Sequence, residues 1–239
     1  MPASNDTYVA QWTINQYTAT FVHNNGTGAT TQKTQDYGTA LTAPTLTRTG
    51  YTLASWNPAV DSTMQAEDKT YTAQWDINQY TAKFVHNDGT DEFTTTTQDY
   101  GSSLLAPNIT RTGYTLSSWV PAVPGTMPAL EVEDNTYTAQ WTGNTYTITF
   151  DKQGGEGGDD SKPVTYGDSL PSISTPTRPG YDFKGYYENT NGGGTKYYNV
   201  NGTGIGTWDK ASSKTLYAYW TPAYVTITFD SNDSNIISI

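Results

Sequence analysis

The alternation of apolar and polar residues changes phase at a recurring point of this sequence. In YTAQWDINQYTAKF, residues 71–84, the apolar positions fall on odd numbers up to Trp75 and on even numbers from Tyr80. Successive side chains of a strand point to opposite faces, so a change of phase means that one strand ends and another begins. The same five-residue step recurs after three other tryptophans, which are Trp12, Trp141 and Trp220. We interpret the chain as tandem β modules that are joined at these points.

The joints divide the sequence into three repeats with partial repeats on either side. Repeat 1 is expected at residues 17–79, repeat 2 at 80–145, and repeat 3, which carries a longer insertion, at 146–221. Residues 1–16 are interpreted as the closing strand of a preceding repeat plus its joint, and residues 222–239 as the opening strand of a following repeat and a tail. The joint length never varies, which favours a short, stiff joint over a flexible tether. We expect a piece of a longer array.

Each repeat is predicted to hold four strands that form one sheet. The strands expected in repeat 1 are Tyr17–His23, a return strand toward Tyr37, Tyr51–Trp56 and Tyr71–Trp75. The dipeptides Asn25-Gly26 and, in repeat 2, Asp88-Gly89 predict tight hairpin turns because they tolerate positive φ angles. A crossover that covers the aromatic face of the sheet follows, with one helical turn predicted at Ala40–Ala43. The side chains of Ile14 and Ile77 are expected to pack at the joints.

Composition excludes several classes of protein. With 12 Lys and Arg against 23 Asp and Glu, the formal charge is −11, which repels phosphate backbones and anionic lipid heads. We therefore expect no nucleic-acid partner, and no apolar run is long enough for membrane insertion. The absence of Cys removes disulfides and zinc–thiolate sites. The opening MPASNDT is too polar for a signal peptide, so any export signal is expected outside this segment.

An ordered set of markers covers nearly the whole chain. In repeat 3 it consists of YTITFDKQGG, VTYGDSLP, TPTRPGYDFKGYY and TWDKASSKTLYAYW, and in repeats 1 and 2 of YG, TRTGYTL-SW and TYTAQW. This set resembles the Listeria–Bacteroides repeat, also called the internalin B-repeat. The resemblance implies small β-grasp-like domains in tandem on secreted or wall-attached bacterial proteins. The fold class that we expect is thus mainly β, with three tandem small β-grasp-like modules forming an elongated rod.

Aromatic residues supply the candidate ligand site. Six of the seven tryptophans recur at repeat positions and are interpreted as core: Trp12, Trp56, Trp75, Trp119, Trp141 and Trp220. Tyr186 takes the position of Trp56 in repeat 3. Trp208 lies outside this pattern, in the insertion that also holds Tyr197 and Tyr198, and these three are the candidate ligand-binding residues. The alternative is that a long insertion needs its own aromatic cluster to stay folded.

Polar clusters give no clear metal or catalytic site. His23 and His86 occupy the same position in successive repeats, too far apart to share one ion, and are interpreted as solvated strand ends. The acidic stretches at residues 151–162 and 230–235 lack the ligand spacing of a calcium loop and are interpreted as solvated. No G-x-S-x-G, H-E-x-x-H or P-loop is present. We expect no catalytic residues, no metal and no cofactor.

The function that these features favour is a non-enzymatic spacer or stalk of a bacterial cell-surface or secreted protein, with a contribution to adhesion. The alternative is a carbohydrate- or protein-binding module that uses the insertion of repeat 3. A surface protein or glycan of a host or a neighbouring cell is the expected partner. A monomer is expected, although the strands at Val9–Trp12 and Val225–Phe229 could pair end to end between molecules.

Overall fold

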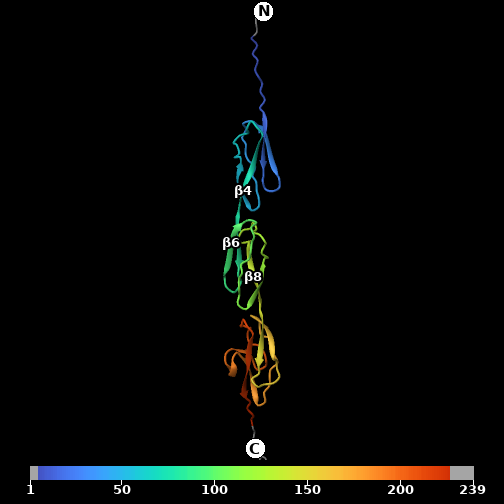
Figure 1. The fold of residues 1–239 in the computed structure, drawn as a ribbon, viewed down its shortest axis with the longest axis vertical. Helices are drawn as coiled ribbons and strands as arrows, with labels where there is room; N and C mark the ends of the chain where they lie inside the picture. The colour runs from blue at the N-terminus through green and yellow to red at the C-terminus, as the bar shows by residue number, and fades with distance from the viewer. Residues whose placement is uncertain (1–4, 227–239) are drawn as a thin grey trace, which may run out of the picture. The chain divides into compact units, whose positions relative to one another are not determined.

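The computed structural model describes residues 5–226, and strands make up nearly all of its regular structure (Figure 1). Repeat 1 holds β1 (Gln16–Val22), β2 (Thr30–Asp36), β3 (Tyr51–Asn57) and β4 (Lys69–Ile77). Repeat 2 holds β5 (Gln79–Val85), β6 (Phe93–Asp99), β7 (Tyr114–Val120) and β8 (Thr136–Gly143). Repeat 3 holds β9 (Thr145–Asp151), β10 (Ser161–Thr165), β11 (Tyr181–Tyr187), the short turn η1 (Thr190–Gly192), β12 (Lys196–Tyr198) and β13 (Lys214–Pro222).

Each repeat forms its own mixed sheet. The strand order is β2-β1-β4-β3 in repeat 1, β6-β5-β8-β7 in repeat 2 and β10-β9-β13-β11-β12 in repeat 3. The first and last long strands of each repeat lie side by side and parallel, so the chain must cross over the sheet between them. The prediction of a mainly β chain with three tandem repeats, each with a small sheet, is confirmed.

The core of repeat 1 lies on the aromatic face of its sheet. The Phe21 ring stacks on Tyr71 at 5.2 Å between centroids and meets the edge of Trp56 at 5.1 Å. Leu41 and Met64, both from the segments between strands, close this face. Repeat 2 builds the same core from Phe84, Tyr137, Trp119, Leu104 and Met127. Aromatic rings, one leucine and one methionine thus supply the large buried side chains of both cores.

Two local predictions need correction. Residues 40–43 form no helical turn, since Ala40 makes a β-bridge with Thr63 and Leu41 donates its N–H to the Ser62 carbonyl. The Leu41 side chain is buried in the core of repeat 1. The hairpin between β1 and β2 is present, but Gly26 (φ 85°) lies in a longer loop, not in a two-residue turn.

The predicted strand at Val9–Trp12 is also wrong. Residues 5–15 form no strand, and the Trp12 side chain is 91% exposed. A strand needs ladder partners, and no strand of the described chain lies beside this segment. Most of the second predicted strand, Val225–Phe229, lies outside the described residues.

Contacts group the chain into two compact units, Met1–Pro107 with Trp119–Thr138 and Asn108–Ser118 with Ala139–Ile239. The contacts at the joint between repeats 1 and 2 fall inside the first unit, and those at the joint between repeats 2 and 3 inside the second. Each joint therefore lies within a single compact unit. Among the described residues, no helix is long and apolar enough to cross a membrane.

Candidate functional site

The three candidate ligand-binding residues lie in the core of repeat 3. Tyr197 and Tyr198 belong to β12 and are 2% and 0% exposed, and Trp208 is 0% exposed. The Tyr197 and Trp208 rings lie 5.4 Å apart, and Phe150 meets Tyr198 at 5.5 Å. A ring that stacks on a sugar needs an accessible face, which none of these three offers. The geometry favours the alternative interpretation, in which the insertion folds around its own aromatic cluster.

Trp208 proves to be part of the shared repeat pattern. Its carbonyl accepts the Gly167 N–H, as the Met64 carbonyl accepts that of Gly38. The residue before it, Thr207, makes the same kind of β-bridge as Thr63 and Thr126 in the other repeats. The expectation that Trp208 stands outside the pattern is therefore wrong, because Trp208 replaces the core methionine of repeats 1 and 2. The dipeptides Thr-Met, Thr-Met and Thr-Trp were the sequence signal for this equivalence.

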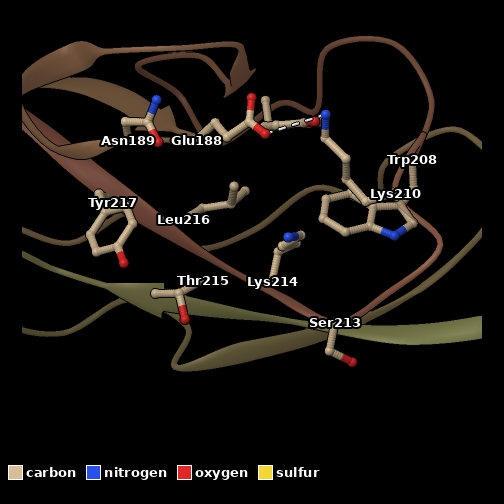
Figure 2. Close-up of a pocket in the computed structure, with 10 residues that line it drawn as sticks. Glu188, Asn189, Trp208, Lys210, Ser213, Lys214, Thr215, Leu216 and Tyr217 are labelled. Carbon is tan, nitrogen blue, oxygen red and sulfur yellow. Dashed lines mark ion pairs between the residues drawn. The ribbon is translucent and has the colours of Figure 1, made fainter.

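A pocket of about 330 Å³ lies beside the insertion of repeat 3 (Figure 2). The residues that line it are Glu188, Asn189, Tyr197, Trp208, Lys210, Ser213, Lys214, Thr215, Leu216 and Tyr217. Figure 2 shows Glu188 and Lys210 joined as an ion pair, with an Nζ–Oε1 distance of 3.3 Å. Glu188 is the one carboxylate among these lining residues, so they offer no acid–base pair for glycoside cleavage.

Charge and hydrogen bonding organise one side of this pocket. The carboxylate of Glu188 raises the pKa of Lys210, and the Lys210 ammonium also lies 3.8 Å from Asp209. The Tyr197 hydroxyl donates to Asp209 at 2.8 Å. Burial, and after it this hydrogen bond, raises the pKa of Tyr197 to about 12. The phenol is thus neutral at physiological pH, and the pocket suits a small polar ligand better than an apolar one.

The structure separates the polar candidates further. Lys152 pairs with Asp160 and Lys162 with Asp159, so these carboxylates of the first acidic stretch have lysine partners. The second stretch, residues 230–235, lies outside the described residues. In the described part of the chain, one group of three or more metal-ligating side chains lies close enough to share an ion: His86, Asp88 and Glu92. Sequence reasoning missed it, because it compared His86 with His23 and not with its own loop.

The joint between repeats 1 and 2 is held by an asparagine. The Asn78 N–H donates to the Gly50 carbonyl, and the Asn78 carbonyl accepts the Tyr100 N–H, both at 2.9 Å. The Thr52 hydroxyl donates to the Asn78 side chain at 2.7 Å. The Tyr100 ring lies directly against Gly50, where a Cβ would overlap it, and meets the Tyr51 ring at 6.0 Å. We call this arrangement of glycine, threonine, asparagine and tyrosine a seam.

The joint between repeats 2 and 3 has the same seam. The Asn144 N–H donates to the Gly113 carbonyl, and the Asn144 carbonyl accepts the Tyr166 N–H, again both at 2.9 Å. Thr115 donates to the Asn144 side chain at 2.6 Å, and the Tyr166 ring covers Gly113. The prediction that Ile77 packs at the first joint is wrong, because its side chain is 43% exposed and Ile14 is 61% exposed. Hydrogen bonds of Asn78, and not apolar packing of Ile77, hold this joint together.

Comparison with known families accounts for all three repeats. The family model of the Listeria-Bacteroides repeat domain matches residues 17–78, 80–142 and 146–219. These matches together cover more than half of the chain.

Three relatives show where such repeats occur. A protein of Evansella cellulosilytica, named as a Gly-rich membrane protein, is 27% identical over 260 residues, which cover 100% of this chain and 29% of the relative. A second protein of that organism, named as a membrane protein, is 26% identical over 237 residues, which cover 90% of this chain and 34% of the relative. Internalin H of Listeria monocytogenes is 37% identical over 127 residues, which cover 47% of this chain and 20% of the relative. The chain thus spans about a third or less of each of these relatives.

Proposed function

The chain belongs to the Listeria-Bacteroides repeat family, and from that premise we propose that it is a non-enzymatic spacer segment of a bacterial cell-surface protein. Its work is mechanical, since it holds another part of the protein at a distance from the envelope. Relatives named as membrane proteins and as an internalin support a place at the cell surface. Adhesion is a secondary role that would depend on the loops.

The observation that carries this proposal is the seam. A flexible tether would leave the polar backbone groups of the joint to water, whereas Asn78 and Asn144 bond to both of the repeats that they join. The tyrosine of one repeat also covers the glycine of the other, which leaves little room for bending. Two joints with the same contacts favour a chain of repeats that resists rotation at each joint.

The described ends of the array offer the two halves of a further seam. Tyr37, at the position of Tyr100, is 56% exposed, and its N–H donates to the carbonyl of Asn15. Gly180, at the position of Gly50, is exposed, and a Cβ there would meet nothing within 4 Å. A repeat of the same kind on either side would cover these surfaces. This complementarity supports a spacer made of many such units.

Small-angle scattering tests the spacer directly. With about 3.3 Å per strand residue and roughly ten residues along each repeat, three repeats in a row would extend on the order of 100 Å. A compact globule with the number of residues of this chain would have a radius of gyration of about 18 Å. Three repeats in a row would give a clearly larger radius of gyration, on the order of 30 Å. A value near 18 Å would overturn the proposal.

Matched glycine variants test whether the seam provides the stiffness. Gly50→Ala and Gly113→Ala each place a Cβ into a tyrosine ring, whereas Gly180→Ala does not. The three glycines have φ angles of 78°, 80° and 75°, so the backbone cost of alanine is common to all of them. In small-angle scattering, we expect the distribution of distances within the particle to broaden in the first two variants. We expect no such broadening in the third. Equal behaviour of all three would show that the tyrosine packing is irrelevant to stiffness.

The pocket of repeat 3 supports a second function, recognition of a small polar ligand such as a glycan. Lys210 and Lys214 lie there beside hydroxyl and amide groups that can bond to sugar oxygens. Titration of a broad glycan panel, followed by the fluorescence of Trp208 and by amide shifts of β13, would detect such binding. Lys210→Ala should abolish any response, and a panel without a response would contradict this second function.

A further inference from the structure

The loop between β5 and β6 gathers an imidazole and two carboxylates. Donor atoms of His86, Asp88 and Glu92 all lie within 4.8 Å of one another. The His86 Nδ1 and the nearer Glu92 oxygen are 3.8 Å apart. The His86 side chain is 16% exposed and that of Glu92 is 72% exposed, so a mostly buried imidazole faces an exposed carboxylate. No part of the spacer function uses this group.

The backbone of the loop holds the three residues on one side. Asn87 adopts a left-handed conformation (φ 50°), which turns the chain sharply between His86 and Asp88. The His86 N–H then donates to the Glu92 carbonyl at 3.0 Å and closes the loop. Thr90 donates to the Asp88 carboxylate through its N–H at 3.0 Å and its hydroxyl at 2.6 Å. These two bonds position the Asp88 carboxylate within the loop.

We propose that this loop is a binding site for a first-row divalent cation, with Zn²⁺ as its best match. Nδ1 of His86 and one carboxylate oxygen each from Asp88 and Glu92 would be the protein ligands, and water would complete the coordination. Zinc bonds of about 2.0–2.2 Å place tetrahedral donors about 3.3 Å apart, so the donors have to close by less than 2 Å. The exposed Glu92 side chain can make most of that movement by rotation.

The surroundings of His86 support the assignment. Its Nε2 lies 2.8 Å from the Thr94 hydroxyl, which can accept a hydrogen bond from the Nε2–H and leave Nδ1 as the metal ligand. The donor set of one imidazole and two carboxylates suits zinc and its neighbours in the first transition row. Calcium needs six to eight oxygen ligands, which these residues do not supply.

The loops of repeats 1 and 3 that correspond to the His86 loop carry different charged residues. Repeat 1 has the same loop, in which Asn24 has a φ of 51° and the His23 N–H donates to the Ala29 carbonyl. There Asn25 stands in place of Asp88 and Ala29 in place of Glu92, so only the histidine remains. In repeat 3 the position of His86 is Lys152, whose ammonium pairs with Asp160. In repeat 3 a lysine ammonium thus neutralises the carboxylate of this loop. In repeat 2 the loop combines two carboxylates with an imidazole.

Two histidines per chain make the test direct. Zinc chloride is titrated into the full chain, without a histidine tag, while calorimetry gives the stoichiometry and NMR follows both imidazoles. We expect one zinc ion per chain, shifts of the His86 ring signals, unchanged His23 signals and reversal by a chelator. Absence of binding at millimolar zinc, or equal shifts of both rings, would overturn the proposal.

Variants that exchange residues between the two loops provide matched controls. Asp88→Asn with Glu92→Ala gives repeat 2 the residues of repeat 1, and should weaken zinc binding at least tenfold without a change in the circular dichroism spectrum. Adding Asn25→Asp and Ala29→Glu to that variant should move the zinc response to His23. Unchanged affinity in the first variant would overturn the site, and a silent His23 in the second would overturn the claim that these three side chains suffice.

Discussion

Repeats 1 and 2 share one fold but anchor the same core tyrosine in opposite ways. In repeat 1 the Tyr71 hydroxyl donates to Asp61 at 2.7 Å, and Asp61 also pairs with the Lys69 ammonium at 2.7 Å. In repeat 2 the Tyr137 hydroxyl donates to the side chain of Asn135 at 2.8 Å, and Asn135 is 0% exposed. One repeat therefore uses a half-exposed ion pair where the other uses a buried neutral amide.

The difference shows two ways of giving the hydroxyl of a core tyrosine a hydrogen-bond acceptor. Asp61 and Lys69 keep part of their hydration, so water can replace a lost partner. Asn135 is fully buried and has no such access to water. Its side-chain amide donates to the Thr81 carbonyl, and its backbone carbonyl accepts the Lys83 N–H. We therefore expect the anchor of repeat 2 to be more sensitive to substitution and the anchor of repeat 1 to be more sensitive to pH.

The largest effect is expected from Asn135→Ala. It leaves the Tyr137 hydroxyl and the Thr81 carbonyl without this partner and opens a cavity, so repeat 2 should lose about 2–4 kcal/mol of its free energy of unfolding. Lys69→Ala is the matched change in repeat 1 and should cost less, because Asp61 keeps Tyr71 and water. Native-state hydrogen exchange in β5 and β8, compared with β1 and β4, measures both. Equal losses would contradict the distinction between buried and solvated anchors.

A smaller effect is expected from removal of the hydroxyl alone. Tyr137→Phe leaves the Asn135 side-chain oxygen buried without this donor and should destabilise repeat 2 by about 1–2 kcal/mol. Tyr71→Phe should destabilise repeat 1 less, since Asp61 still accepts from Lys69. Urea denaturation of the two variants checks the order. A larger loss for Tyr71→Phe would mean that the ion pair depends on the tyrosine.

The smallest effect is a dependence of the tyrosine anchor in repeat 1 on acid, since the anchor in repeat 2 holds no carboxyl. The Lys69 ammonium, and then the Tyr71 hydroxyl, donate to Asp61 and hold its pKa below the ordinary 3.8. A carboxyl with a lowered pKa in the folded state stabilises the fold above its unfolded pKa, and this stabilisation is lost as pH falls through the folded value. The difference in urea midpoint between wild type and Asp61→Asn should therefore shrink below pH 3.8.

The control for this pH series is Asn135→Ala, whose amide does not titrate. Its destabilisation should stay the same across the acidic range, in which Asn135, Tyr137 and Met127 carry no titrating group. A destabilisation by Asn135→Ala that falls in parallel with that of Asp61→Asn would assign the acid effect to the chain as a whole.

Much of the fold could be predicted from alternation alone. Trp56 and Trp119 pack against their cores as expected, and Tyr186 meets Phe150 in the corresponding place of repeat 3. Trp208 was misjudged, because the longer insertion of repeat 3 obscured its equivalence to Met64. The number of residues between two positions does not reveal which loop residues make equivalent backbone contacts in different repeats.

The sequence by itself determined that the chain holds three tandem repeats built mainly of strands, and that Trp56 and Trp119 pack against the cores. It could do so because the direction of a strand side chain follows from its place in the alternation, which is a local property. Only the tertiary structure decided that Asn78 and Asn144 hold the seams, that Asn135 is buried, and that His86 lies beside Glu92. These depend on left-handed loop residues and on hydrogen bonds between segments distant in the chain, and alternation contains neither.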